Sequence, residues 1–273
     1  MRIVITGAAG HLGGLASAAL SAHDLILVDR RRIGDPRGIA VNLARAPTPG
    51  SRVRWRRGWD RLFRGADVIL HLAGVPSPKG RWAQVRRHNI EATWHVLEAA
   101  AAHAVPKVVF ASSTWAIRAE ERERRASGDG RLIGSDVPPR PITAYGAAKA
   151  FGEIAGRMFV DEGRLRTFIA MRIGYCPPDG RYPAGDVLAP LWIGRGDAAQ
   201  FLRRCVEAEV EGFHVVYGVS VVSDCPFDLG PTSRLLAWTP VEIGECAPSS
   251  RETDPVPGAL SRGVARTSGS SGA

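Results

Sequence analysis

A tyrosine and a lysine four residues apart, Tyr145 and Lys149, form a pair whose types and spacing could serve catalysis. Residues four apart lie on one face of a helix, so the phenol and the ammonium can point into the same cleft. A nearby cation favours the phenolate and lowers the pKa of a tyrosine from its usual value of about 10. The pair therefore predicts that Tyr145 acts as a general base, against the alternative of a surface pair without chemistry.

Two serines, Ser112 and Ser113, directly follow the apolar segment 107–111, which is predicted to be a strand. Ligand sites in open α/β sheets lie beyond the carboxyl ends of the strands. A serine hydroxyl at that place can hydrogen-bond a substrate oxygen while a proton moves to or from it. We therefore expect Ser113, Tyr145 and Lys149 to be the catalytic residues.

A glycine-rich turn, Gly7-Ala8-Ala9-Gly10-His11-Leu12-Gly13, follows one predicted strand and opens a predicted helix. Glycines let the backbone turn sharply and approach a pyrophosphate, while the helix N-terminus offers free N–H groups. The spacing G-x-x-G-x-x-G differs from the more familiar G-x-G-x-x-G, and an ordinary tight turn is the alternative. We interpret the turn as a dinucleotide site whose predicted cofactor-binding residues are Gly7, Gly10, His11, Leu12 and Gly13.

An aspartate, Asp29, ends the second predicted strand, roughly 20 residues after the glycine turn. A carboxylate there accepts hydrogen bonds from the adenosine ribose, and it repels the 2′-phosphate of NADP. The three arginines that follow, residues 30–32, act in the opposite sense because an arginine beside this site can hold that phosphate. We expect NAD as the cofactor, with NADP left open.

The elements that would position these residues alternate between strand and helix, which predicts a parallel sheet covered on both faces. The predicted strands are residues 2–6, 25–29, 67–72, 107–111, 166–172 and 213–217, and the predicted helices are 11–21, 81–103, 144–161 and 197–209. Segment 119–135 is predicted to be a polar loop. The predicted fold class is α/β, a Rossmann-type doubly wound parallel sheet with a small C-terminal substrate-binding part.

Three parts of the chain are expected on this pattern. They are an NAD(P)-binding Rossmann domain (1–173), a substrate-binding part with returning Rossmann elements (174–247) and a disordered tail (248–273).

With 273 residues and 45% apolar content, the chain can bury a full core. No apolar stretch suits a membrane span or a signal peptide, so we expect a cytoplasmic protein. The four cysteines (Cys176, Cys205, Cys225 and Cys246) lack metal-type spacing and are expected to be free thiols.

A net charge of +9 raises the alternative of a nucleic-acid-binding protein. The lysines are only Lys79, Lys107 and Lys149, so nearly all of the basic charge comes from arginine. No known nucleic-acid-binding module is present, and a solvated arginine-rich surface is therefore the favoured interpretation. We expect no nucleic-acid or membrane partner, and we leave a homo-oligomer open.

Together these residues resemble the extended, epimerase-like branch of the short-chain dehydrogenase/reductase superfamily. The resemblance covers residues 1–237 and includes, besides the residues above, His71-Leu72-Ala73-Gly74, Asn89 and Met171-Arg172-Ile173-Gly174. Within this branch the chain is most similar to the NAD-dependent uronate dehydrogenases. The segments that carry this similarity are Asp136 to Pro141, Phe151-Gly152-Glu153, Arg172 to Cys176 and Val215 to Gly218.

The resemblance implies oxidation at C1 of a hexuronic acid to an aldonolactone, with hydride passing to NAD. It implies that Tyr145 is the base, Ser113 its hydrogen-bonding partner and Lys149 the ribose-binding modulator. Further cofactor contacts are expected from Leu72, Ala73, Gly74, Asn89, Tyr145 and Lys149. Substrate contacts are expected from Ser77, Ser113, Thr114, Tyr145, Tyr175 and Arg181, with Arg181 as the candidate partner of the carboxylate.

This sequence departs from the uronate dehydrogenases at several positions. Thr114 stands where they carry asparagine, Trp115 and Arg118 also differ, and Tyr175 replaces a small serine. The segment 56–59, Arg-Arg-Gly-Trp, replaces the usual acidic residue for the adenine. These departures leave the fold and the cofactor class intact and put the identity of the substrate in doubt.

Two alternative functions remain. A sugar-nucleotide epimerase or dehydratase would retain tightly bound NAD, although the region after Gly174 is short for a nucleotide-diphosphate pocket. A non-catalytic nucleotide-sensing or RNA-binding protein could use the same fold, although it would not need the Tyr145 and Lys149 pair.

Overall fold

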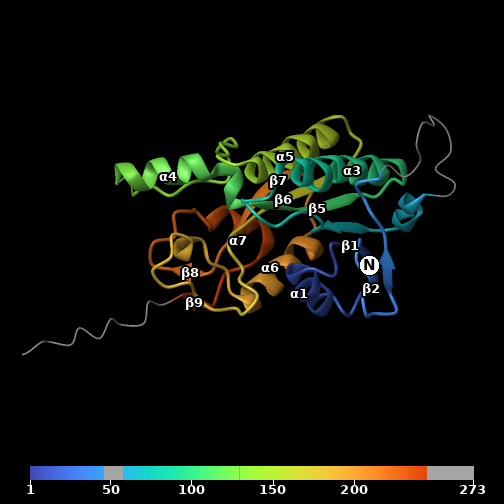
Figure 1. The fold of residues 1–273 in the computed structure, drawn as a ribbon, viewed down its shortest axis with the longest axis horizontal. Helices are drawn as coiled ribbons and strands as arrows, with labels where there is room; N and C mark the ends of the chain where they lie inside the picture. Colours follow the sequence, from blue (N-terminus) through green and yellow to red (C-terminus); the bar gives the residue numbers. More distant parts are fainter. Residues whose placement is uncertain (46–57, 129, 245–273) are drawn as a thin grey trace, which may run out of the picture.

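The computed structural model of the chain describes residues 1–45, 58–128 and 130–244 (Figure 1). The predicted disordered tail, residues 248–273, lies outside the described residues, as do Cys246, Arg56 and Arg57. Among the described cysteines, Cys176, Cys205 and Cys225 are free thiols, as expected.

Seven parallel strands form one sheet in the order β3-β2-β1-β4-β5-β6-β7. Their bounds are β1 (Arg2–Thr6), β2 (Asp24–Asp29), β3 (Gly38–Ala40), β4 (Val68–His71), β5 (Lys107–Ser113), β6 (Thr167–Ile173) and β7 (Gly212–Gly218). The strand order reverses between β1 and β4, which is the place where open α/β sheets bind ligands. The predicted fold class is confirmed, and β3 is the one strand of this sheet that the sequence did not indicate.

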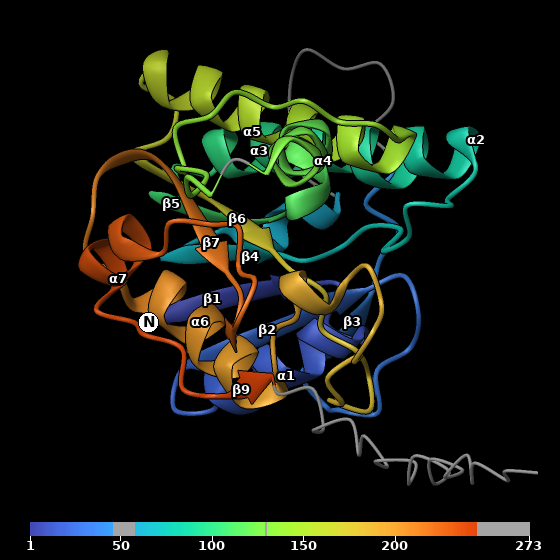
Figure 2. The ribbon, with the colours of Figure 1, turned by 90° about the vertical axis from the view of Figure 1, so that its left-hand side faces the viewer.

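Helices cover both faces of this sheet (Figure 2). One face carries α1 (His11–Ala19) and α6 (Arg195–Glu207), and the other carries α3 (Ala92–Ala102) and α5 (Ala144–Asp161). Strand β1 explains why both faces need cover, because successive side chains of a strand point to opposite sides. Ile3 and Ile5 pack into the core cluster that includes α6, whereas Val4 packs into the cluster that includes α3.

The segment predicted as one helix over residues 81–103 is helical from Trp82 to Ala102, with a change of helix type inside it. It consists of α2 (Trp82–Val85), a π-helical segment (Arg86–Glu91) and α3. Such π-helical interruptions of α-helices often occur at functional sites. Asn89 lies within this interruption, and its place is described with the site below.

The prediction of a polar loop over 119–135 is wrong for its first half, which forms the helix α4 (Arg118–Ser127). Seven of its ten residues are charged, so the sequence shows no apolar periodicity that would predict a helix. Ion pairs one turn apart stabilise it instead, as between Glu120 and Arg124 at 2.7 Å. Gly128 ends it in the left-handed conformation. In Figure 1 this helix projects beyond the end of the sheet.

The remaining elements lie in the described C-terminal part or are short. They are α7 (Gly230–Leu236), a two-stranded parallel sheet of β8 (Val221–Val222) and β9 (Ile243–Gly244), and 3-10 helices at Trp59–Phe63, Thr114–Ile117 and Ala189–Leu191. Because β7 and α6 return to the main sheet, residues after 174 are interleaved with the Rossmann elements, and the expected domain boundaries stay predictions.

In the part of the chain that the structure describes, no helix combines the length and the apolar character of a membrane span. The expectations about cytoplasmic location, oligomeric state and nucleic acid stay predictions.

A buried ion pair ties α5 to β6, the strand beside the edge strand β7. Glu153 of α5 and Arg172 of β6 are 3% and 1% exposed, and they meet through Nε to Oε1 at 3.1 Å and Nη2 to Oε2 at 2.9 Å. The hydroxyl of Ser112 in β5 donates to Glu153 Oε1 at 2.5 Å, and Arg172 Nη1 donates to the hydroxyl of Tyr217 in β7 at 3.2 Å. One network therefore joins α5, β5, β6 and β7.

Removing one partner of this pair should destabilise the fold strongly. Arg172→Met would leave the Glu153 carboxylate buried without its cation, which costs about 3 to 5 kcal/mol of unfolding free energy. Arg203→Met is the matched control, since Arg203 forms an exposed pair with Glu207 at 3.0 Å and should cost less than about 1 kcal/mol. Urea denaturation followed by circular dichroism measures both, and equal losses would contradict the role given to the buried pair.

Candidate active site

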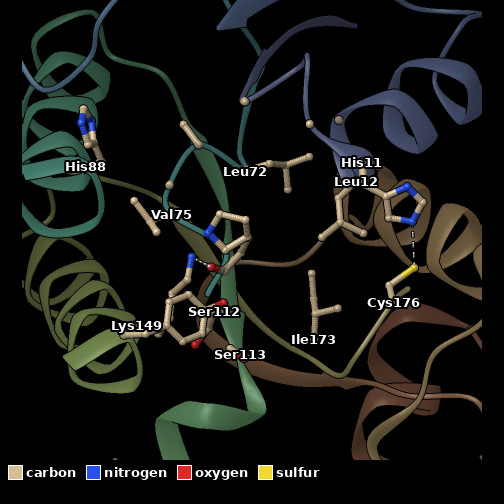
Figure 3. Close-up of a pocket in the computed structure, with 18 of the residues that line it drawn as sticks. His11, Leu12, Leu72, Val75, His88, Ser112, Ser113, Lys149, Ile173 and Cys176 are labelled. Carbon is tan, nitrogen blue, oxygen red and sulfur yellow. Dashed lines mark hydrogen bonds between the residues drawn. The ribbon is translucent and has the colours of Figure 1, made fainter. Parts of the chain in front are cut away.

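A cavity of about 580 Å³ lies along the carboxyl ends of the strands (Figure 3). Its walls come from the glycine turn, from the residues that end or follow β2, β4, β5 and β6, and from the start of α5. Figure 3 shows Lys149, Ser112 and Ser113 grouped on one side of it, with His11 and Cys176 on the other. The cavity therefore joins the glycine turn to the predicted catalytic residues.

The glycine turn brings its backbone against the end of β4. Gly7 has φ of +74°, and a Cβ added there would lie 2.7 Å from the backbone nitrogen of Ala73. Within the described residues no side chain caps the N-terminus of α1, so backbone N–H groups at that end can bind an anion. Gly7, Gly10, His11, Leu12 and Gly13 all line the cavity, as a dinucleotide site requires.

Asp29 ends β2 beside this turn and also lines the cavity. Its carboxylate is 8% exposed and accepts hydrogen bonds from the backbone N–H of Ala9 at 3.1 Å and of Arg31 at 2.9 Å. These bonds fix its position at the distance from the turn where an adenosine ribose would lie. Its role in binding the cofactor stays a prediction.

The residues after β4 continue the wall, and Asn89 supports them from behind. Leu72, Ala73, Gly74 and Val75 line the cavity, whereas Asn89 does not. Asn89 accepts from the Val75 N–H at 2.8 Å and donates to the Val75 carbonyl at 3.1 Å. The structure thus places Asn89 as a support for the loop that borders the cavity.

His71 lies beneath this loop, fully enclosed. Its ring nitrogens contact the hydroxyls of Thr6 at 2.7 Å and Thr93 at 3.1 Å. Burial, aided by the charge of Lys149, lowers the pKa of His71 to about 3. His71 is therefore a neutral structural residue at physiological pH and does not exchange protons with a substrate.

Tyr145, Ser113 and Lys149 meet at the wall of the cavity, as the sequence predicts. Thr143 caps α5 by accepting from the Gly146 N–H at 3.1 Å, which fixes Tyr145 in the first turn. Tyr145 and Ser113 line the same part of the wall, and the Ser113 hydroxyl favours the phenolate of Tyr145. One turn later, Lys149 is 6% exposed and donates to the Ala111 carbonyl at 2.6 Å.

The pKa of Tyr145 in the structure is raised, whereas the sequence led us to expect that Lys149 lowers it. Burial raises the pKa of Tyr145, although its hydrogen bond with Ser113 acts in the opposite direction. Burial also lowers the pKa of Lys149 to about 8. The Lys149 ammonium lies 5.6 Å from the centre of the Tyr145 ring and is held by a carbonyl, so desolvation outweighs its effect on the phenol.

The predicted substrate-binding residues divide into two groups. Thr114 and Tyr175 line the cavity together with Ser113 and Tyr145. Ser77 is not part of the wall, and its hydroxyl accepts from the Lys79 N–H at 3.2 Å. Arg181 is exposed, and its backbone N–H donates to Asp179 at 3.1 Å outside the wall. The structure therefore does not bring Arg181 to the cavity, and the substrate roles of all these residues stay predictions.

Several residues of the cavity wall were not among the predicted site residues. Trp115 follows the paired serines, and Pro178, Leu188 and Leu191 come from a region without periodicity. Cys176 lies on the opposite side, where its sulfur is 3.4 Å from His11 Nε2. No spacing rule points to the proline and leucines, because only the folded loop after β6 brings them to the cavity.

These features fit NAD, which the sequence leads us to expect. The N-terminus of α1, which no side chain of the described residues caps, offers N–H groups to a pyrophosphate, and Asp29 offers carboxylate oxygens to a ribose. In the described residues no group of three or more histidine, cysteine or acidic side chains could hold a metal ion.

Several known proteins are similar to this chain in sequence and in fold. Residues 3–176 match the NAD dependent epimerase/dehydratase family. The uronate dehydrogenase of Agrobacterium fabrum is 31% identical over 89% of this chain and 86% of its own length. The L-arabinose 1-dehydrogenase (NAD(P)(+)) of Haloferax volcanii is 29% identical over 88% of this chain and 96% of its own.

Solved structures agree with these relatives. A mutant of the Agrobacterium tumefaciens uronate dehydrogenase complexed with NAD superposes with a TM-score of 0.71 at 28% identity, covering 89% of this chain and 85% of that one. The resemblance to the epimerase-like branch is thereby confirmed. The chain belongs to the NAD-dependent epimerase/dehydratase family.

Proposed function

We propose that this chain is an NAD-dependent dehydrogenase that oxidises a hexuronic acid at C1 to an aldonolactone. The observation that carries the proposal is that Tyr145, Ser113 and Lys149 line the same cavity as a dinucleotide-type glycine turn. The uronate dehydrogenases among its relatives, which match most of the chain, support this substrate class.

In the proposed mechanism, Tyr145 as the phenolate accepts the proton of the C1 hydroxyl. Ser113 hydrogen-bonds the same oxygen and holds it beside the phenol. Lys149, while protonated, favours the phenolate by its charge. NAD, when bound, supplies the acceptor for the hydride that leaves C1. The apolar wall, which includes Leu191, excludes water from this step.

A neutral aldose is a second candidate substrate, because the described wall near Tyr145 contains no arginine and its cation there, Lys149, donates to the Ala111 carbonyl. The arginines in that wall, Arg30 and Arg31, lie at the far end beside Asp29. Arg172 is bound to Glu153, and Arg181 lies outside the wall. A carboxylate buried without a cation or several N–H donors is costly, and this cost is the reason to keep a neutral aldose as the second candidate.

A panel of free sugars tests the proposed function. The purified chain is mixed with NAD and, separately, with hexuronates, neutral aldoses and nucleotide sugars, and NADH is followed by its near-ultraviolet absorbance. We expect NADH to form with hexuronates. Formation with neutral aldoses alone would replace the first substrate by the second. Turnover of nucleotide sugars without net NADH would contradict both and support an epimerase.

The pH dependence of oxidation should reflect Tyr145 and Lys149. The phenolate fraction of Tyr145 grows with pH, so kcat should rise through the neutral range. Above about pH 8 Lys149 loses its proton, and the rise should flatten because the cation that favours the phenolate is gone. Lys149→Arg keeps a cation at all these pH values, so its rise should continue further. Profiles that flatten at the same pH in both proteins would contradict this role of Lys149.

A further inference from the structure

Among the described residues, Trp115 is the only tryptophan in the cavity wall. It follows Ser113 by two residues, and its side chain is half-buried. The proposed proton transfer does not use it. A large aromatic side chain at this distance from the reacting hydroxyl lies where the rest of a sugar substrate must be bound.

The backbone of Trp115 is fixed against the residues that handle the proton. Its N–H donates to the Ser113 hydroxyl at 3.3 Å, which caps the 3-10 helix Thr114–Ile117. A Cβ on Gly146, the neighbour of Tyr145, would overlap the Trp115 carbonyl oxygen, so the first turn of α5 packs directly on this backbone. Trp115 therefore has a fixed place relative to both Ser113 and Tyr145.

The indole ring of Trp115 is held by a buried arginine. The guanidinium carbon of Arg118 lies 5.4 Å from the centre of the ring, where the negative charge of the aromatic face attracts a cation. Arg118 is 4% exposed, and its Nη1 donates to Glu121 Oε2 at 2.5 Å. This pair keeps the guanidinium against one side of the indole, while Trp115 also borders the cavity.

A pyranose ring has the surface that such an indole binds. Its hydroxyls point outward around the edge, whereas its faces carry C–H hydrogens with a partial positive charge, which the negative face of an aromatic ring attracts. The same cavity wall offers the hydroxyls of Ser113, Thr114 and Tyr145 to the edge of the sugar. Trp115 and these hydroxyls together match both parts of a pyranose.

We propose that Trp115 determines the specificity of this site for a pyranose by stacking its indole on a C–H face of the sugar while the C1 hydroxyl meets Ser113 and Tyr145. The inference rests on the proposed function for the place of the reacting hydroxyl. It holds for a hexuronate and for a neutral aldose, because both contain the ring.

Sugar binding to the NADH complex tests the inference without turnover. Glucuronate and glucose are titrated separately into each variant with NADH bound, and calorimetry measures the affinity. Trp115→Leu should weaken binding of the sugar that wild type prefers by about 10-fold or more, whereas Trp115→Phe, which keeps an aromatic face, should weaken it by less than about fivefold. NADH affinity, measured by nucleotide fluorescence, should stay within about threefold of wild type in both variants.

Trp94→Ala is the matched control for loss of a tryptophan. The Trp94 ring packs on Phe159 at 5.6 Å outside the cavity wall, so its removal should leave sugar affinity unchanged. Trp115→Gln is a second variant without an aromatic ring, and it replaces Trp115→Leu if that protein no longer binds NADH.

The outcomes separate this inference from the proposed function. Equal affinities in wild type and Trp115→Leu, or equal losses in the Leu and Phe variants, would overturn the stacking and leave the dehydrogenase proposal standing. Sugar binding that depends on Trp115, without NADH formation when NAD replaces NADH, would support the stacking and contradict the dehydrogenase. Failure of wild type to bind either sugar would overturn both.

Discussion

The buried pair of Glu153 and Arg172 is the constraint on which the site depends. Tyr145, Lys149 and Glu153 follow one another at intervals of four along α5, so they share one face of the helix. Separating the buried pair would leave two uncompensated charges inside the protein, which prevents α5 from sliding along β6. Because Glu153 also accepts from Ser112, the strand that carries Ser113 is fixed in the same network.

Burial around this network destabilises the ionised forms of nearby side chains, and the proposed reaction depends on this effect. It raises the pKa of Tyr145 and lowers that of Lys149, so the charged forms of both residues are less stable than in water. A phenolate formed under these conditions is a stronger base than one free in solution. His71, which lies near Lys149, is kept neutral by the same desolvation and adds no positive charge beneath the cavity.

Much of the fold and part of the site could be predicted from the sequence, because their signals are local. Strand-length apolar runs, a glycine turn and a four-residue spacing do not depend on the rest of the chain. Helix α4 was missed because charged pairs, not an apolar stripe, stabilise it. The place of Arg181 and the wall residue Leu188 could not be predicted, since the path of the loop after β6 decides which side chains reach the cavity.

The proposed mechanism requires that Tyr145 accepts the proton of the substrate hydroxyl. The most direct test is the kcat for NADH formation by Tyr145→Phe. The phenyl ring is retained, so NAD affinity should stay unchanged while kcat falls by about 100-fold or more, the usual scale for loss of a general base. Tyr182→Phe is the control, because Tyr182 lies outside the cavity wall, against the ring of Trp192, and it should keep most of its kcat. Turnover of Tyr145→Phe close to that of the wild type would contradict the account.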